Sequence, residues 1–278
     1  MAVILLLLRE ALALNGKERL IGIIGGGGKT TLLYRLADEF AASGGRVLLT
    51  TTTKMCRPAA HQADQFLVTA DDKKILLEFC RGYNRRSNQF SAGQDRSGNG
   101  RDGAGERIFL AKELLPENKV QGIEPILVSE LALNDSFNVI LVEADGAARR
   151  SAKGYAPHEP NIPAVSDVVI VVTGLDLLGG ELTSRWVHRA ALAAQQIWRP
   201  EGSYLDEEAM AKLNGLGAQM ARKQAFQARR VAFLNKADTL EKVEKGVDIA
   251  RHLLDSGLVE RVLVGSCISA EPVVALLQ

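Results

Sequence analysis

The sequence has few cysteines and no excess of charge of one sign. Its three cysteines, Cys56, Cys80 and Cys267, are far apart and form no C-x-x-C pair, so they predict neither a disulfide framework nor a zinc knuckle. This pattern indicates a reducing, cytoplasmic location. The 34 lysines and arginines balance 33 aspartates and glutamates, for a formal net charge of +1. That balance argues against broad attraction to nucleic acid or to an anionic membrane.

Long hydrophobic runs are also missing. The apolar stretch from Ala2 to Leu8 is too short to span a bilayer. No basic residue precedes it, and Arg9 and Glu10 interrupt it, unlike a secretion signal. We therefore expect no membrane segment and interpret the run as a short amphipathic helix packed on the domain.

Short runs rich in Val, Ile and Leu alternate with segments of helical spacing. This alternation predicts an α/β fold with three layers, in which helices cover both faces of a mostly parallel central sheet. A chain of 278 residues that is 46% apolar fits a single domain over 1–278. A polar stretch at about 83–107 is predicted to be an exposed loop or insertion, or alternatively a functional lid. A helical segment is expected at about 184–228. The predicted strands are Leu20–Ile24, Arg46–Leu49, Asn138–Val142, Asp167–Val172, Arg230–Leu234 and Arg261–Val264.

The motif G-G-G-G-K-T-T follows the first predicted strand and opens a predicted helix. Glycines let consecutive N–H groups turn toward phosphate oxygens, and the helix start adds its positive dipole end. The usual phosphate loop has a glycine where this chain has Ile23, so the loop resembles the shortened Mur-ligase form. The alternative is a glycine-rich turn with an incidental lysine. The predicted nucleotide-binding residues are Gly25, Gly26, Gly27, Gly28, Lys29, Thr30 and Thr31, with Lys29 on the β- and γ-phosphates and Thr30 on Mg²⁺.

Polar residues follow the next strand, at the edge where parallel sheets bind ligands. Four threonines, Thr50–Thr53, and Lys54 offer hydroxyls and charge to a metal or a γ-phosphate. The alternative is a strand end whose hydroxyls cap the following turn. We predict Thr52 as a metal ligand, and Thr53 and Lys54 as substrate or switch residues.

A further strand leads into Glu143, Asp145 and Gly146. Carboxylates in this place hold water on Mg²⁺ or orient an attacking water in P-loop proteins. An ordinary acidic turn is the alternative. Together with the glycine motif, this predicts Lys29, Glu143 and Asp145 as catalytic residues, Thr30 and Asp145 as metal ligands, and Gly146 as a switch residue.

The segment from Arg149 to Pro160 comes directly after the acidic motif. His158 and Glu159 can carry protons or bind a metal, although a lone His–Glu pair in a loop is more often structural. We predict His158 as catalytic, and Arg149, Lys153 and Glu159 as substrate or switch residues.

The tetrapeptide N-K-A-D, at Asn235, Lys236 and Asp238, follows another buried strand. N-K-x-D is the guanine-recognition motif of GTPases, because its aspartate accepts hydrogen bonds from N1–H and the 2-amino group. Adenine would leave that carboxylate unpaired. Alone the motif is weak, so both GTP and ATP remain open as ligands.

With these motifs in order, the chain resembles the YqeC-type accessory proteins of selenium-dependent molybdenum hydroxylases. The resemblance implies a cytoplasmic P-loop protein that assists maturation of a molybdenum hydroxylase, with that enzyme or its cofactor-maturation proteins as partners. Glu143-x-x-Gly146 also resembles the switch motif of metallochaperone GTPases, which often work as dimers. The resemblance rests on G-G-G-G-K-T-T-L-L, T-T-T-T-K-M, V-E-A-D-G-A, H-E-P-N-I-P, G-L-D-L-L-G, V-H-R at Val187–Arg189, and F-L-N-K-A-D.

Three functions fit these residues. The preferred one is a nucleotide-hydrolysing maturation factor, in which the γ-phosphate and Mg²⁺ order the loops after Thr50 and Glu143. The second is a small-molecule kinase or ligase that holds its substrate with Arg149, Arg150, Lys153 and His158. The third is a non-hydrolysing module that nucleotide merely stabilises.

Overall fold

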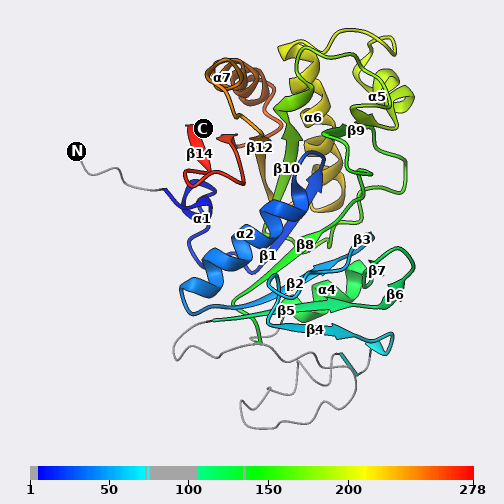
Figure 1. Cartoon of the computed structure of the whole chain (residues 1–278), viewed down its shortest axis with the longest axis vertical. Helices are drawn as coiled ribbons and strands as arrows, with labels where there is room; N and C mark the ends of the chain where they lie inside the picture. The colour runs from blue at the N-terminus through cyan, green and yellow to red at the C-terminus, as the bar shows by residue number, and fades with distance from the viewer. Residues whose placement is uncertain (1–5, 73, 76–104, 134–135) are drawn as a thin grey trace, which may run out of the picture.

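The computed structural model describes residues 6–72, 74–75, 105–133 and 136–278. Its middle layer is a nine-stranded sheet, ordered β14-β13-β12-β10-β1-β8-β2-β5-β4 (Figure 1). All neighbours are parallel except β14, which runs antiparallel to β13. The predicted α/β class with a mostly parallel sheet is confirmed. The strands are β1 (Leu20–Gly25), β2 (Arg46–Thr51), β4 (Gln65–Val68), β5 (Glu106–Ala111), β8 (Val139–Glu143), β10 (Val168–Gly174), β12 (Arg229–Asn235), β13 (Arg261–Gly265) and β14 (Val273–Leu277).

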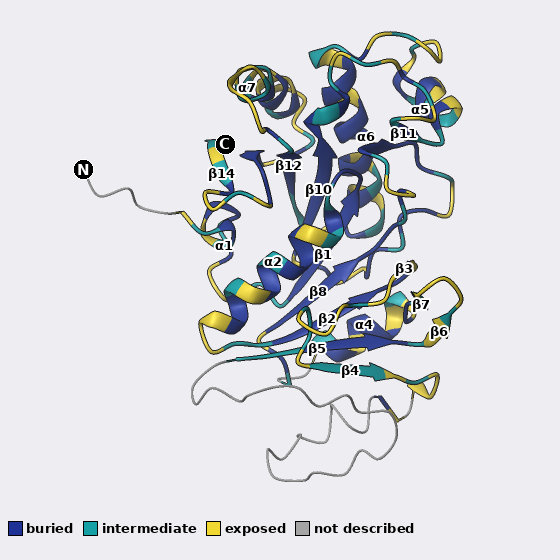
Figure 2. Cartoon of the chain, in the orientation of Figure 1, coloured by how far each residue is buried: buried dark blue, intermediate teal, exposed yellow. Residues whose placement is uncertain are grey.

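Helices cover both faces of this sheet. One face buries Ile21 and Ile23 of β1 against the N-terminal helices, and the other buries Leu20 and Ile24 against the remaining ones. This alternation follows from the period of two in a strand. Figure 2 shows buried strands in the middle layer and exposed residues on the outer sides of the helices. The first face carries α1 (Leu8–Ala11) and α2 (Lys29–Ala42); the second carries α4 (Pro125–Ala132), α5 (Ala190–Ile197), α6 (Glu207–Gln224) and α7 (Leu240–Asp255).

Two small sheets flank the main one. β3 (Lys54–Cys56), β7 (Lys119–Gln121) and β6 (Glu113–Leu115) form an antiparallel sheet. β9 (Ala152–Lys153) pairs in parallel with β11 (Val187–His188).

Two further expectations from the sequence concern the polar stretch at about 83–107 and the absence of a membrane segment. The polar stretch predicted at about 83–107 lies outside the described residues up to residue 104. No helix in the described ranges combines the length and apolar character needed to cross a membrane.

Helix α6 approaches the sheet closely because it has glycine at the contact. A Cβ at Gly217 would lie 2.5 Å from Val171 Cγ1 and 2.7 Å from the Tyr155 hydroxyl. At Gly215, two positions earlier in the same helix, a Cβ would meet only the tip of Leu258, at 3.1 Å. The β-branched side chain of Val171 in β10 is stiff and cannot move away from an added Cβ, whereas the flexible tip of Leu258 can.

We predict opposite outcomes for alanine at these two glycines. Gly217→Ala should lower the free energy of unfolding by about 1–2 kcal/mol, because overpacking outweighs the gain in helix propensity. Gly215→Ala, the matched control, should be neutral or stabilise by up to about 1 kcal/mol. Denaturant unfolding of both variants measures the difference, and equal effects would show that α6 is not held this close to β10.

Candidate functional site

The glycine motif forms the whole turn between β1 and α2. Gly25, Gly27 and Gly28 have φ angles of 98°, 75° and 125°. Residues other than glycine rarely adopt such positive φ angles. A Cβ at Gly25 would lie 2.2 Å from the carbonyl oxygen of Val172. Glycine is therefore required here by backbone conformation and by close packing together.

Three amides of this turn are bonded within the chain. Gly25 N–H donates to Asp145 Oδ2 at 2.9 Å, Gly26 N–H to the Val172 carbonyl at 2.8 Å, and Gly27 N–H to the Arg150 carbonyl at 2.9 Å. The N–H groups of the first turn of α2, from Lys29 to Thr31, have no intrahelical acceptor by the geometry of a helix start. An anion at this site would thus be held by the start of α2 rather than by the first glycines.

Thr30 and Glu143 meet at the carboxyl edge of the sheet. The Thr30 hydroxyl donates to Glu143 Oε2 at 2.7 Å, although the two residues are 113 positions apart. Glu143 ends β8, the strand beside β1. Burial raises the pKa of its carboxyl, and the ammonium of Lys29 and the hydroxyl of Thr30 oppose that rise only in part.

A chain of alternating charges runs from the glycine turn into the second face of the molecule. Lys29 Nζ lies 3.2 Å from Asp145 Oδ1, and Lys153 Nζ lies 3.3 Å from Asp145 Oδ2 and 2.9 Å from Glu159 Oε2. Arg189 pairs with the same Glu159 oxygen. We call these five residues the buried ion chain; Asp145 and Lys153 are fully buried within it.

Charges within the buried ion chain shift the pKa values of Lys29 and Glu159. Burial lowers the pKa of Lys29, but the carboxylates of Asp145 and Glu143 outweigh it, so the pKa is raised. Burial raises the pKa of Glu159, but hydrogen bonds from Arg189 and Lys153 outweigh it, so the pKa is lowered. Both groups are therefore held in their charged forms at neutral pH.

The threonine run has its hydroxyls occupied by the backbone. Thr50, Thr51 and Thr52 donate to the carbonyls of Leu110, Glu143 and Asn161, at 2.8, 2.8 and 2.7 Å. Thr53 is half-buried and Lys54 is exposed. The run thereby ties β2 to β5, to β8 and to the segment after Glu159.

The segment after Gly146 crosses over the glycine turn. Ala148 and Arg149 have φ angles of 46° and 61°, and this turn brings the Arg150 carbonyl to the Gly27 amide. Arg150 Nε donates to Ser184 at 2.7 Å. Arg149 and His158 are exposed. Their exposure contrasts with Lys153, which is fully buried.

The N-K-A-D residues lie against the other side of the turn. Asn235 Nδ2 donates to the Gly27 carbonyl at 2.7 Å, and its Oδ1 accepts the Cys267 amide at 2.9 Å. Lys236 Nζ contacts Asp176 Oδ2 at 2.7 Å and Ser151 Oγ at 2.9 Å. Asp238 is exposed at the same edge.

Several residues at this site were not among the predicted site residues. Arg189 and Asn161 join the site only through pairing of distant segments, and no spacing in the sequence reveals them. Arg189 does lie within the V-H-R motif. Asp176 had a signal, since it follows the buried strand β10 at the ligand-binding edge of the sheet.

The described residues contain no group of three or more His, Cys, Asp or Glu side chains that could hold a metal ion. Mg²⁺ does not need such a group, because proteins bind it through one or two ligands together with water and phosphate oxygens. The Thr30 hydroxyl and the Glu143 carboxylate provide oxygens of the required kind. The fit therefore depends on a phosphate ligand arriving with the ion.

A family model described as "YqeC protein" matches residues 21–191. The chain belongs to the YqeC family. This confirms the resemblance drawn from the motifs. The matched range includes the glycine turn, Glu143 and the whole buried ion chain, whereas Asn235 lies beyond it.

A curated relative from Escherichia coli (strain K12), described as "Uncharacterized protein YqeC", is 34% identical over 131 residues. The alignment covers 45% of this YqeC-family chain and 49% of the relative, so the chain spans about half the length of the curated relative it matches. No solved structure matches the chain.

We predict that the ion chain stabilises the fold only while Glu159 is charged. Its folded pKa is lowered, so its contribution is complete above the unfolded value of 4.5 and is lost as pH falls through the lower folded value. At pH 7, Glu159→Gln should lower the free energy of unfolding by about 3 kcal/mol, because Lys153 and Arg189 lose a charged partner.

Chemical unfolding at pH 7 and at pH 3 measures this difference. The loss should shrink at pH 3, because the stability that a charged carboxyl with a lowered pKa provides is lost progressively below its unfolded value of 4.5. Glu208→Gln, which removes a carboxylate from an exposed pair with Lys212, is the control and should change little. An equal loss for Glu159→Gln at both pH values would contradict charge pairing as the cause.

Proposed function

We propose that this chain binds a magnesium–nucleoside triphosphate at the start of α2 and hydrolyses it slowly to switch the segment Gly146–Lys153. The contact between the Thr30 hydroxyl and the Glu143 carboxylate supports this most directly. It brings the Glu143 carboxylate to the hydroxyl of Thr30, the residue after Lys29, at the start of a helix that follows a glycine turn. This combination suits an anion and a hard cation together.

Each residue has a role that follows from its position. Lys29 holds the terminal phosphates with its ammonium group, and the amides of the first turn of α2 hold their oxygens. Thr30 and Glu143 hold Mg²⁺, which when bound neutralises charge on the phosphates. Hydrolysis is slow in this proposal because Arg189 pairs with Glu159 and Arg150 bonds to Ser184, so neither is free to contact a phosphate.

The buried ion chain supplies the switch. Lys29 cannot give full charge to both Asp145 and a polyphosphate, so ligand binding weakens the 3.2 Å pair between them. Asp145 then depends on Lys153, which also donates to the Gly146 carbonyl at 2.7 Å. A change at Lys29 is thereby passed to Gly146–Lys153 and, through Glu159, to Arg189 at the start of α5.

The base is guanine in this proposal. Asn235 connects the glycine turn to the loop after β13, so the loops that would flank a base are held against the phosphate site. The exposed Asp238 carboxylate can accept the two donors of guanine, whereas adenine offers a lone pair there. ATP is the alternative ligand.

The client is part of the proposal and rests on the resemblance that the sequence motifs imply. YqeC-type proteins are expected to assist the maturation of a selenium-dependent molybdenum hydroxylase. The chain would then deliver or insert a component when Gly146–Lys153 changes conformation.

Competition of GTP and ATP for the purified chain, by calorimetry with and without Mg²⁺, tests the binding step. Wild type should bind GTP in a magnesium-dependent manner and prefer it to ATP. Asp238→Asn should lose about tenfold or more in that preference, since a charged hydrogen-bonding acceptor is removed. Lys29→Ala should weaken both nucleotides by a similar factor.

Lys223→Ala, an exposed lysine in the last turn of α6, is the matched control and should bind as wild type does. Released phosphate without a phosphorylated product separates hydrolysis from a kinase or ligase reaction. Absence of magnesium-dependent binding of either nucleotide to wild type would refute the proposed function. Turnover at tens per second in isolation would refute the switch.

A further inference from the structure

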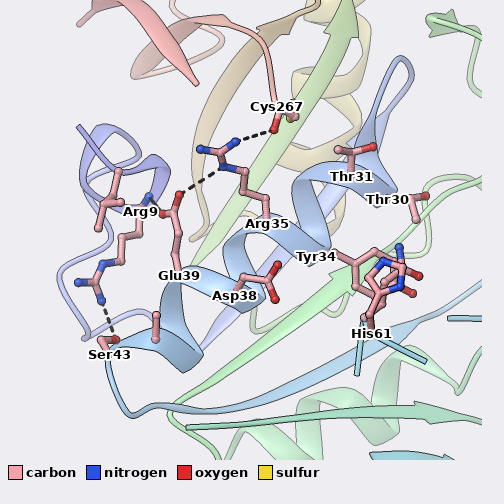
Figure 3. Close-up of a pocket in the computed structure, with 13 residues that line it drawn as sticks. Arg9, Thr30, Thr31, Tyr34, Arg35, Asp38, Glu39, Ser43, His61 and Cys267 are labelled. Atoms are coloured by element: carbon pink, nitrogen blue, oxygen red, sulfur yellow. Dashed lines mark hydrogen bonds and ion pairs between the residues drawn. The ribbon is translucent and has the colours of Figure 1, made fainter. Parts of the chain in front are cut away.

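Tyr34 stands one helical turn after Thr30 and on the same side of α2. Residues four apart share a helix face, and helical side chains lean toward the N-terminus. The phenol ring is therefore carried toward Thr30 and Glu143. Tyr34 is 6% exposed, and Figure 3 shows it extending from α2 toward His61.

The hydroxyl of Tyr34 is buried and has no hydrogen-bond partner among the described residues. Native proteins rarely leave a buried polar atom in this state, and a bound water is one partner that would satisfy it. Burial raises the pKa of this hydroxyl, and the nearby Glu143 and Cys56 raise it further. The group thus remains a neutral donor and acceptor beside a carboxylate.

The ring borders a groove of about 760 Å³ that runs along α2. Thr30 and Thr31 line the same groove, so it reaches the start of the helix. The charged side chains farther along already have partners: Arg35 lies 3.7 Å from Glu39, and Asp38 pairs with Arg107. The groove is large enough for water and borders Tyr34, while the Tyr34 hydroxyl itself is buried and has no hydrogen-bond partner among the described residues.

We propose that Tyr34 is a positioning residue of the magnesium site, whose hydroxyl hydrogen bonds to a water held between the ring, Glu143 and the incoming ion. This rests on the proposed function. Mg²⁺ loses its waters reluctantly and keeps several when bound, so the protein must offer partners to those waters. The main role of Glu143 and Thr30 is to contact the ion; Tyr34 orders its hydration.

A phenylalanine at this position separates function from folding. In the absence of nucleotide and Mg²⁺, Tyr34→Phe should be as stable as wild type or more stable, because it removes a buried hydroxyl without a partner. With GTP present, the Mg²⁺ concentration for half-maximal nucleotide binding should rise about three- to tenfold, the effect of one lost hydrogen bond. At saturating Mg²⁺, GTP affinity should match wild type.

Calorimetric GTP titrations at a series of Mg²⁺ concentrations, together with denaturant unfolding of the ligand-free protein, give both readings. Tyr204→Phe, an exposed tyrosine, is the control and should leave both unchanged. If wild type binds GTP and Tyr34→Phe has the same Mg²⁺ requirement, this inference would be overturned and the proposed function would not be affected. Marked destabilisation of Tyr34→Phe would overturn it too, by showing a structural partner. Failure of wild type to bind GTP with Mg²⁺ would refute the proposed function itself.

Discussion

The buried carboxylate of Asp145 holds the site together. Its oxygens accept the Gly25 amide and lie between the ammonium groups of Lys29 and Lys153. A fully buried carboxylate is costly unless charged and hydrogen-bonding partners surround it. The glycine turn, the start of α2 and strand β9 must therefore keep their positions together, and none of them can shift without disturbing that carboxylate.

This constraint changes how the glycine turn can act. The motif predicts that amides around Gly26 face a phosphate, but the Gly26 and Gly27 amides bond to the Val172 and Arg150 carbonyls. These glycines serve to bring backbones into contact. In the proposed function, anion binding would therefore fall to the start of α2, beside Thr30 and Glu143. The part of the motif that carries the nucleotide proposal is its C-terminal half.

The sequence predicts the central strands well because burial on both faces makes them continuous apolar runs. The predictions at Leu20–Ile24 and Asn138–Val142 agree with β1 and β8 to within a residue. The edge strands β4 and β14 were not predicted, since half-buried strands lack such runs; β5 was not predicted either. The helical segment expected at about 184–228 contains α5 and α6, and Gly217 of α6 packs too closely on β10 to carry a side chain.

The site was predictable only to the level of strand ends. Residues after parallel strands share an edge, so Lys29, Glu143 and Asn235 are expected near one another. The choice of Glu143 rather than Asp145 as the partner of Thr30 depends on where β8 ends, and Arg189 enters through a two-residue pairing. Because Asn235 contacts Gly27 across 208 positions, a nascent chain gains this support for its glycine turn only after β12 has been synthesised and has joined the sheet. A chain that ended before β12 would leave β10 as an unpaired sheet edge open to association with other chains.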